Sequence, residues 1–562
     1  MPTISIQKED LFQLIGKSFS NEELADYLQL VKGELKDETA GSGEIKIELN
    51  DTNRPDLWCV EGIARQIRFK LGRQKSDYRL FDRTNRNDYT LQVEASVKRV
   101  RPLIGAFVVK NIQVNDVVLQ QLIQTQEKLC ENFGQKRKSL AIGIYPLGGI
   151  TFPVKYQAVD PKSVQFVPLG LDQELNLEQI LLQHPKGQQY GHLVKSFSQF
   201  PLLTDQEGRI LSFPPVINSR ERGEVAAGAS DLFIEATGTQ FNLLKLALNI
   251  LVYNFADRGG EIVPVTIRYP YPVEGKKTIQ FPQRVRNRVE LETKLFERLI
   301  GEQINPRKIQ KTLGEYGCET SLTKKKMMIS TLDYRDDYMH PVDVVEDYAI
   351  SRGFASFKPT LPAIFHTGGV VAMTNLADKV RGIAVGLGFE EMFTNILTRK
   401  PDLTEKMMRQ DAVVEVENVM VENYSCLRNS LLPGLLKIEN TSYKAVYPHK
   451  IFEVGEVSVW DPNENHGSRT EIHCALLIAQ SRATFSEMHS YLDNLLYYLG
   501  LEGVVRERGF SFSIEGRAGE ILVQEKIQGH LGEIHPKILT AWEIKVPCVV
   551  CELNLSNLLK ML

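Results

Sequence analysis

Near the N-terminus, the pattern of hydrophobic and polar positions switches between the strand period and the helix period. The strand-like run Thr3–Ile6 leads into two segments with helical spacing, 8–14 and 21–30, and the alternating segment Glu44–Leu49 predicts a second strand. A turn rich in Asn, Asp and Pro then precedes a helix that we expect to start near Asp56. This order predicts an α/β unit at the N-terminus.

The next part of the chain, from about 95 to 265, is rich in strand-forming residues. Apolar runs at 104–110 and 164–168 predict strands, whereas the segments 127–132 and 241–253 have helical spacing. We therefore expect a strand-rich domain that contains a few helices.

A compact segment follows the strand-rich part. Asn305 and Pro306 form a helix start, the helix that follows has one apolar face, and Gly317 ends it. The pattern also predicts an earlier helix over 289–300 and strands on both sides of 324–326. Two helices and a small sheet would suit nucleic-acid docking and subunit packing equally well.

The C-terminal part of the chain, residues 360–562, has the pattern of one larger α/β domain. An amphipathic helix over 376–387 is closed by Gly388. Strand and turn segments follow it, among them Ile451–Glu456 and Leu531–Pro536.

Size and composition narrow the class of protein. The 562 residues are too many for one hydrophobic core, and 43% apolar with 24% charged residues is ordinary for a soluble multidomain protein. No stretch approaches the roughly 20 apolar residues that a membrane-spanning helix needs, and the N-terminus has no apolar signal-peptide segment. Seven scattered cysteines are typical of a reducing compartment, so we expect a cytoplasmic protein with no membrane partner.

The formal net charge of −3 argues against a protein that binds polyanions over its whole surface. Two basic clusters are present: Lys136–Lys138, and Arg284, Arg286 and Arg288 together with Lys324–Lys326. Each cluster is compatible with an ordinary solvated surface or with a local nucleic-acid contact. The sequence contains no Walker-type glycine-rich loop that would hold a nucleotide phosphate.

The segment Tyr334–Phe354 carries the most informative chemistry. At about 100° per residue, Asp343, Glu346 and Asp347 share one arc of a helix, and the opposite arc is apolar, formed by Val344, Val345, Tyr348 and Ala349. Asp337 lies six residues before Asp343 and can fold over the same face. Four converging carboxylates repel each other unless a cation separates them, which predicts a hard divalent ion such as Mg²⁺. The alternative is that these residues only complement the helix dipole.

The residue order of this segment resembles the B5 domain of the phenylalanyl-tRNA synthetase β subunit. Arg-Asp-Asp is followed after five residues by Asp, after two more by Glu-Asp, and then by an aromatic-rich Gly-Phe exit. The resemblance implies a Mg²⁺ site formed by Asp337, Asp343, Glu346 and Asp347. The family usually has Glu at the last of these positions, and the shorter Asp347 favours ligation through water.

Two further stretches resemble the same β subunit. The pattern Asn-Arg-x-Asp-x-x-x-x-Glu-Gly at 53–62 is similar to its N-terminal strand-to-helix segment. The strings within 201–239 resemble the B3/4 domain of archaeal-type and eukaryotic-type β subunits. In that family the B3/4 domain hydrolyses tyrosine that is wrongly attached to the tRNA.

The resemblance to the B3/4 domain implies an editing pocket formed by Leu203, Ser212, Glu235 and Thr237. Leu203 would shape a wall, and the three polar residues would contact the substrate. A site built to pair the tyrosine hydroxyl rejects phenylalanine, because phenylalanine leaves the buried polar groups unpaired. Some family members carry Asp where this chain has Glu235, so the reach of the carboxylate differs. The alternative is that Ser212 and Thr237 only cap turns beside Pro and Gly.

The C-terminal part resembles the catalytic-like module of the β subunit, which shares the antiparallel fold of class II synthetases. The family's usual Asn-Pro-Met reads Asn418-Val419-Met420 here. Arg428 stands where class II enzymes place an arginine on the ATP phosphate, but the sequence has no motif 3 arginine in its expected context. We therefore assign no catalytic residue for aminoacylation to this chain.

The resemblance covers nearly the whole chain and implies a multidomain α+β protein. Its expected domains are an N-terminal B1-like α/β unit over 1–92, a strand-rich B3/4 editing-like domain over 93–268, a small B5 domain over 274–355 and a catalytic-like module over 358–562. The chain is identified as a member of the archaeal/eukaryotic type, because bacterial β chains are longer and carry an extra oligonucleotide-binding fold and an anticodon-binding domain.

The function follows as an implication of the resemblance. In an (αβ)₂ heterotetramer, the α subunit would bind ATP and phenylalanine, and this chain would support it, bind tRNA(Phe) and hydrolyse mischarged Tyr-tRNA(Phe). Two alternatives stay open. One is a non-catalytic tRNA-binding scaffold subunit without active editing. The other is a Mg²⁺-dependent phosphoryl-transfer enzyme, which the missing phosphate-binding loop disfavours.

Overall fold

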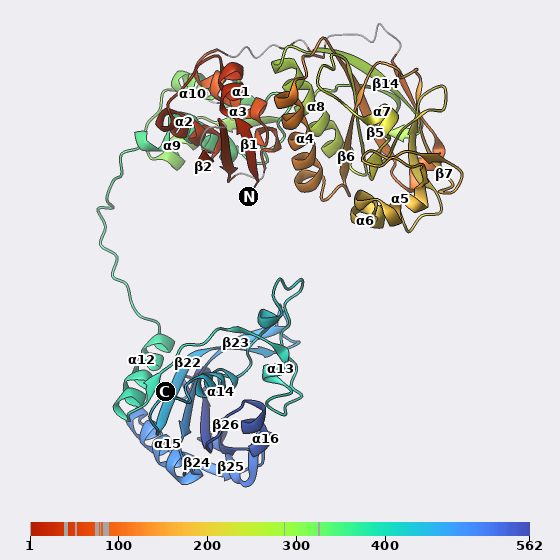
Figure 1. The fold of residues 1–562 in the computed structure, drawn as a ribbon. Helices are drawn as coiled ribbons and strands as arrows, with labels where there is room; N and C mark the ends of the chain where they lie inside the picture. Colours follow the sequence, from red (N-terminus) through yellow and green to blue (C-terminus); the bar gives the residue numbers. More distant parts are fainter. Residues whose placement is uncertain are drawn as a thin grey trace. The chain divides into compact units, whose positions relative to one another are not determined.

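The computed structural model describes residues 2–38, 43–50, 53–73, 78, 80–81, 89–285, 287–323 and 326–562. It divides into two compact units, Met1–Thr360 and Leu361–Leu562, each described here by itself (Figure 1). In the part of the chain that the structure describes, no helix is long and apolar enough to cross a membrane.

The N-terminal part of the first unit is a small antiparallel sheet covered by helices. Its elements are β1 (Thr3–Gln7), α1 (Lys8–Ile15), α2 (Asn21–Leu28), β2 (Gly33–Glu38), β3 (Glu44–Leu49) and α3 (Val60–Lys70). β3 pairs with β1 and β2, and its inward residues Ile45, Ile47 and Leu49 are buried, which confirms the strand predicted there. Helix α3 begins at Val60, later than the expected start near Asp56, because a 3₁₀ turn over Pro55–Leu57 and an extended Cys59 come first.

A single glycine makes this late helix start possible. A Cβ atom added to Gly62 would lie 1.8 Å from the carbonyl oxygen of Asp56, so only glycine lets the turn pack directly on α3. Arg65, on the same helix, is buried and pairs with Asp257 at 2.7 Å. These contacts fix the N-terminal part to the neighbouring sheet.

A large mixed sheet forms the middle of the first unit. Its elements are β4 (Thr90–Val93), β5 (Leu103–Lys110), α4 (Asp116–Lys128), β6 (Leu140–Pro146), β7 (Val154–Val159), β10 (Phe200–Thr204), β11 (Ile210–Phe213), β12 (Ile217–Asn218), β13 (Leu232–Gly238), α8 (Phe241–Asp257), β14 (Glu261–Val273) and β15 (Lys276–Phe281). Among the described residues, the strand order is β12-β11-β10-β7-β4-β14-β5-β13-β6, and β15 pairs with β14. Helix α8 packs on β5, β13 and β14 and buries most of its length, because its side chains are mainly apolar.

The third part of the first unit is a three-stranded sheet with helices. Its elements are β16 (Arg288–Glu292), α9 (Lys294–Ile300), α10 (Pro306–Gly314), β17 (Glu319–Leu322), β18 (Lys326–Ser330) and α11 (Pro341–Arg352). The helix start at Asn305 is confirmed, because its side chain accepts a hydrogen bond from the N–H of Arg307. The helix predicted over 289–300 is confirmed in its second half as α9. Its first half is wrong, because β16 pairs with β18 along its whole length and this pairing outweighs the helical spacing.

This third part packs against the helical side of the N-terminal part (Figure 1). Leu30, Tyr316 and Ile350 form a shared buried cluster, and the hydroxyl of Tyr316 donates to the carbonyl of Leu30 at 2.8 Å. Lys70 donates to Glu315 at 3.0 Å and to the carbonyl of Ser351 at 2.6 Å. Two segments separated by more than two hundred residues therefore fold as neighbours.

The second unit is a sheet between two layers of helices. Its main elements are α12 (Ala372–Gly386), β19 (Glu390–Glu391), α14 (Leu432–Thr441), β22 (His449–Trp460), β23 (Ser468–Ala479), α15 (Phe485–Leu499), β24 (Gly503–Glu507), β25 (Ser513–Val523), β26 (Lys526–Ile534), α16 (Pro536–Ala541) and β27 (Cys548–Asn554). Their order is β19-β22-β23-β27-β26-β25-β24, and all neighbours are antiparallel except β19 and β22. The predicted helix closed by Gly388 is confirmed as α12.

The two faces of this sheet show why both helical layers form. Along β23, Cys474, Leu476 and Ile478 pack in the cluster that contains α12 and α15. The alternate residues Ala475, Leu477 and Ala479 pack in the cluster that contains α14 and α16. Because side chains alternate across a strand, a run of consecutive apolar residues needs a cover on both faces.

Candidate functional site

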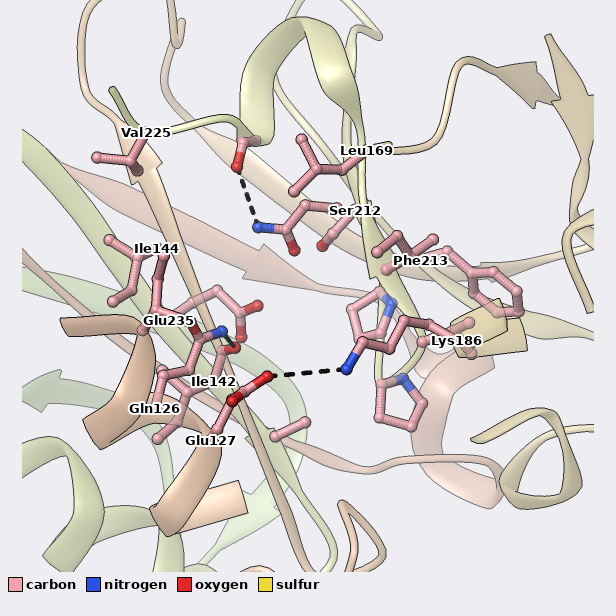
Figure 2. Close-up of a pocket in the computed structure, with 18 of the residues that line it drawn as sticks. Gln126, Glu127, Ile142, Ile144, Leu169, Lys186, Ser212, Phe213, Val225 and Glu235 are labelled. Atoms are coloured by element: carbon pink, nitrogen blue, oxygen red, sulfur yellow. Dashed lines mark hydrogen bonds and ion pairs between the residues drawn. The ribbon is translucent and has the colours of Figure 1, made fainter. Parts of the chain in front are cut away.

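A cavity of about 480 Å³ lies in the large sheet region of the first unit. Figure 2 shows Gln126, Glu127, Ile142, Ile144 and Glu235 on one side of it, facing Leu169, Lys186, Ser212 and Phe213. Most of the lining is apolar, with a few polar side chains placed among the apolar ones. This composition is typical of sites that bind small organic groups.

Glu235 is the buried acid of this cavity. It lies on β13, in register with Gly143 on β6 and Ala106 on β5, and is 3% exposed. A Cβ atom added to Gly143 would lie 2.5 Å from Oε1 of Glu235 and 2.3 Å from the hydroxyl of Tyr145. The missing side chain at position 143 therefore makes the room in which these two groups meet.

A short chain of hydrogen bonds reaches Glu235 from across the sheet. The hydroxyl oxygen of Tyr145 lies 2.8 Å from Oγ of Ser212 and 3.0 Å from Oε1 of Glu235. Ionised Glu235 can only accept, so Tyr145 donates its single phenol proton to Glu235, and in this state the Ser212 hydroxyl donates to Tyr145. Oε2 of Glu235 has no hydrogen-bond partner within the described residues, although it is buried.

The environment of Glu235 changes its acidity. Burial raises the pKa of Glu235 to about 7, and the hydrogen bond from Tyr145 and the charge of Arg101 oppose this rise. The carboxyl group therefore titrates near neutral pH and faces an apolar cavity with one oxygen unpaired. A group with these properties in a cavity is typical of a functional site.

The other predicted pocket residues have different positions. The hydroxyl of Thr237 accepts a hydrogen bond of 2.9 Å from Nε of Arg101, so its polar atom is already engaged, although the residue lines the cavity. Leu203 pairs with Ser212 across β10 and β11 but is packed in the hydrophobic core, and it is not among the residues that line the cavity. Its predicted wall is formed instead by residues such as Phe213 and Pro214.

Tyr145 is a neighbour of Glu235 that the sequence did not predict. It lies at the end of the run 140–145, which reads as an ordinary apolar strand. Its side chain shares a face with Gly143, and therefore with Glu235 on the neighbouring strand. Only the pairing of β6 with β13 brings the two together, and no local signal in the sequence indicates that pairing.

Basic groups lie at the edge of the cavity. Lys186 pairs with Glu127 across it at 3.8 Å, as Figure 2 shows. Arg137, from the basic cluster 136–138, donates to the carbonyls of Pro215 and Val216 at 3.0 and 2.9 Å and lies over the ring of Tyr190. One basic cluster of the sequence therefore contributes a residue to the cavity. From the other motifs, Asp51, Thr52, Arg286, Lys324 and Lys325 lie outside the described residues.

The four predicted metal ligands lie on or just before α11, but they do not converge. Arg335 lies between two of them: it donates to Asp337 at 2.9 and 2.6 Å and to Asp347 at 2.7 Å. Asp347 also accepts a hydrogen bond of 2.5 Å from Tyr338 and is buried, whereas the sequence analysis placed it on a carboxylate face opposite the core. The buried Arg335 thus supplies the cation that the sequence analysis assigned to a metal ion.

The other two carboxylates are engaged separately. Oδ2 of Asp343 accepts hydrogen bonds of 2.7 Å from the N–H groups of Met339 and His340 and so caps the helix start. Glu346 is exposed and pairs with Lys32 at 2.7 Å. Within the described ranges, no group of three or more acidic, His or Cys side chains is arranged to hold a metal ion. In this arrangement the four residues do not fit a metal centre.

Acidity differs between the two buried carboxylates beside Arg335. Burial opposes ionisation of Asp337, but the charge and hydrogen bonds of Arg335 win and lower the pKa of Asp337 to about 2. For Asp347, burial is the larger effect and raises the pKa. One arginine therefore stabilises at least one full negative charge inside the protein.

In the second unit, Arg428 is held by the protein itself. Its Nη1 atom donates to Glu453 and to the hydroxyl of Thr394, both at 2.7 Å, and only 4% of its surface is exposed. A Cβ atom added to Gly455 would lie 2.4 Å from Nη2 of Arg428. A guanidinium closed in by these groups is not displayed toward a nucleotide phosphate.

Three parts of the chain match known protein families. Residues 1–73 match the Phe-tRNA synthetase beta subunit B1 domain, residues 289–354 match the tRNA synthetase B5 domain, and residues 358–555 match the Phenylalanyl tRNA synthetase beta chain CLM domain.

Full-length relatives agree with these matches. The chain is 38% identical over 567 residues to the phenylalanine–tRNA ligase beta subunit of Borreliella burgdorferi strain ZS7, and 37% identical over 564 residues to that of Borrelia hermsii, with 100% of each chain covered. Among solved structures, an N-terminal fragment of the phenylalanyl-tRNA synthetase beta subunit from Pyrococcus horikoshii matches with 36% identity and a TM-score of 0.59. That match covers 62% of this chain and 99% of the fragment.

Proposed function

The chain belongs to the family of phenylalanine–tRNA ligase β subunits, and on that premise we propose that it edits mischarged Tyr-tRNA(Phe) in the cavity around Glu235. The ligase joins phenylalanine to tRNA(Phe) with ATP, and this chain is the subunit that supports the α subunit and binds tRNA. The adenylation site belongs to the α subunit, consistent with an Arg428 that Glu453 and Thr394 hold in place.

One observation carries the editing proposal: a buried carboxylate faces an apolar cavity with Oε2 unpaired. A tyrosine side chain that enters the cavity supplies the missing donor, because its hydroxyl can donate to Oε2. Phenylalanine leaves Oε2 unpaired, and an unpaired buried polar group costs binding free energy. Among the predicted pocket residues, Ser212 and Glu235 supply polar atoms, Thr237 lines the cavity, and Leu203 supports it from the core.

The test is deacylation by the assembled ligase. This chain, co-purified with its α partner, is mixed with Tyr-tRNA(Phe) and, separately, with Phe-tRNA(Phe). We expect selective hydrolysis of the tyrosyl ester and its loss in Glu235→Ala, with synthesis of Phe-tRNA(Phe) unchanged in both proteins. Normal synthesis without tyrosyl hydrolysis in the wild type would contradict editing and leave a scaffold subunit that docks tRNA.

The finer classification is also a proposal. The 36% identity to the Pyrococcus horikoshii fragment supports the archaeal/eukaryotic type. The length argument behind that expectation is corrected, because bacterial relatives of the same length match this chain from end to end. We propose domains that begin at 1, 93 and 358, as predicted. The predicted boundary between 93–268 and 274–355 is corrected, because β14 and β15 pair in the large sheet, which therefore extends to Phe281. We also propose an (αβ)₂ heterotetramer and a cytoplasmic location, which seven free cysteines support.

The place of Mg²⁺ in this assembly is a separate proposal. The present arrangement does not fit a metal ion, so we propose that Asp337, Asp343, Glu346 and Asp347 become its ligands only in a different arrangement formed in the assembled ligase. Their sequence motif and the general Mg²⁺ dependence of the family support this proposal. Arg335 would have to release Asp337 and Asp347 first. Melting of the αβ assembly with Mg²⁺ and with a chelator tests this, because a ligand bound only to the folded state raises the melting temperature. Equal melting temperatures would remove these four residues as ligands.

A further inference from the structure

Tyr145 is placed to control how Glu235 meets a substrate. Of the two carboxylate oxygens, Oε1 accepts the hydrogen bond of 3.0 Å from Tyr145, and Oε2 is buried without a partner within the described residues. Burial raises the pKa of Tyr145 above its usual range, so the phenol keeps its proton and can only be a donor toward the carboxylate. The two oxygens of one carboxylate are therefore not equivalent.

We propose that Tyr145 is a positioning residue of the editing cavity, which holds Oε1 of Glu235 so that Oε2 alone receives the hydroxyl of a mischarged tyrosine. This inference rests on the proposed editing function. Tyr145 touches the carboxylate and not the ester, so its effect passes through Glu235. Ser212 is the outer member of the same relay, because its hydroxyl donates to the oxygen of Tyr145.

The geometry explains why the arrangement is fixed. Tyr145 is fully buried and lies on β6, two residues from Gly143, whose missing side chain leaves the space that the hydroxyl and Oε1 occupy. The ring of Tyr145 packs against Phe233 with ring centroids 5.9 Å apart, which limits its rotation. The carboxylate is therefore held in one orientation before any substrate enters the cavity.

Tyr145 also acts on the charge of the carboxylate. Its hydrogen bond is the larger of the two influences that lower the pKa of Glu235, and the charge of Arg101 is the other. Tyr145 faces Glu235 through a hydrogen bond, and Arg101 acts on it through its charge. Ser212 is bonded to Tyr145 and not to Glu235. Tyr156 and Cys130 interact with the charge of Glu235 more weakly, and Lys186 and Glu127 line the same cavity. Removal of the Tyr145 hydroxyl takes away one of the two effects that lower the pKa of Glu235. The pKa therefore rises, and the ionised form of Glu235 becomes rarer at neutral pH.

The experiment measures kcat/KM for Tyr-tRNA(Phe) deacylation by the αβ assembly between pH 5.5 and 8.5, corrected for spontaneous hydrolysis. Tyr145→Phe removes only the hydroxyl. We expect the pH midpoint of the activity to rise by about half a pH unit or more, because a hydrogen bond to an ionised group is lost. We also expect the ratio of tyrosyl to phenylalanyl hydrolysis to fall by about threefold to tenfold, because the carboxylate loses its fixed orientation.

The matched control is Tyr271→Phe. The hydroxyl of Tyr271 donates to the carbonyl of Pro102 at 2.6 Å, so this variant also loses a phenol hydrogen bond but does not touch Glu235. Its pH midpoint should equal that of the wild type. Synthesis of Phe-tRNA(Phe) by the partner subunit reports whether each variant assembly is intact.

Three results separate the proposals. A raised midpoint in Tyr145→Phe with an unchanged Tyr271→Phe supports the inference. Equal profiles in the two variants, while the wild type hydrolyses the tyrosyl ester, overturn the role of Tyr145 and leave the editing function standing. A wild type without tyrosyl hydrolysis overturns both. If Tyr145→Phe fails to assemble, Ser212→Ala replaces it: loss of the donor to Tyr145 must shift the midpoint in the same experiment, and an unchanged midpoint overturns the inference.

Discussion

The cavity around Glu235 and the cluster around Arg335 show two opposite ways to bury carboxylates. Arg335 donates to both Asp337 and Asp347, and Tyr338 adds a further hydrogen bond to Asp347. Glu235 lines the cavity and has a donor on Oε1 only, and its buried Oε2 has no partner among the described residues. In the first arrangement both carboxylates have a cationic donor, and the buried atom left without a partner among the described residues is a donor, Nη1 of Arg335. In the second arrangement the atom left without a partner is an acceptor, Oε2 of Glu235, which a donor from a ligand can satisfy. A buried carboxylate therefore indicates a ligand site when one of its oxygens lacks a hydrogen-bond donor. The number of acidic residues in a cluster does not by itself indicate a ligand.

The largest loss of stability is expected for Arg335→Met, which removes the cation from the first arrangement. The variant leaves Asp337 and Asp347 buried without the cation that pairs with both at 2.6 and 2.7 Å. Removing one partner of a buried ion pair costs about 3–5 kcal/mol of unfolding free energy. Denaturant unfolding at pH 7 measures this loss.

Lys32→Met is the control for that variant, because Lys32 pairs with the exposed Glu346 on the same helix. An exposed pair contributes about 0–1 kcal/mol. Equal losses in the two variants would contradict the view that Arg335 replaces a metal ion inside the protein.

Glu235→Gln tests whether burial in the cavity opposes the ionisation of Glu235. The pKa of Glu235 is raised from 4.5 to about 7, so the folded protein loses stability as the pH rises through this window. A neutral Gln of the same shape avoids that loss, and we expect it to raise the free energy of unfolding at pH 8 by about 2–3 kcal/mol. Near pH 4 the two proteins should be equally stable. A variant that loses tyrosyl hydrolysis but shows no gain at pH 8 would mean that Glu235 is not held against its ionisation.

Asp337→Asn should show the opposite dependence on pH. The pKa of Asp337 is lowered from 3.8 to about 2, so its ionisation stabilises the fold above pH 4, and this contribution is lost as the pH falls toward 2. We expect a loss of about 2 kcal/mol at pH 7 and a smaller difference at pH 3. A loss that stays constant between these pH values would show that packing, and not charge, is responsible.

The smallest effect is expected for Glu127→Gln at the edge of the cavity. Glu127 and Lys186 are 3.8 Å apart, with side chains 55% and 36% exposed, so the unfolding free energy should change by less than about 0.5 kcal/mol. The variant leaves Lys186 without this acidic partner, and we expect the KM for Tyr-tRNA(Phe) to fall by about twofold at low salt. The difference should vanish at high salt, where charges on the surface are screened. A KM unaffected by the substitution at low salt would place the tRNA elsewhere.

Local signals predicted several elements and helix ends of the fold correctly. The cap at Asn305 and the left-handed turn at Gly388 depend on neighbouring residues only. The end of α10 is at Gly314, before the predicted Gly317. The first half of the segment 289–300 is a strand, because β16 takes its hydrogen bonds from β18, more than thirty residues later. Local spacing cannot report a partner strand.

The candidate sites show the same division. The resemblance to the B3/4 domain implied Glu235 and Ser212, and both line one cavity. Helical spacing placed Asp347 on a carboxylate face, but in the fold it is buried against Arg335. The resemblance assigned a wall of the pocket to Leu203, but Phe213 lines the cavity and Leu203 lies in the core. Tyr145 was interpreted only as part of an apolar strand.

The sequence by itself determined the family, the order of the domains' motifs and the acidic residues worth testing, because these depend on residue identity and spacing. Only the tertiary structure decided which carboxylates are satisfied and which is not. Hydrogen bonds and ion pairs between Tyr145 and Glu235, or between Arg335 and Asp347, require atoms within about 3 Å, and strand pairing and helix packing set those distances. The free energy of a buried charge depends on those partners, so the role of a buried charged residue can be assigned only from the folded structure.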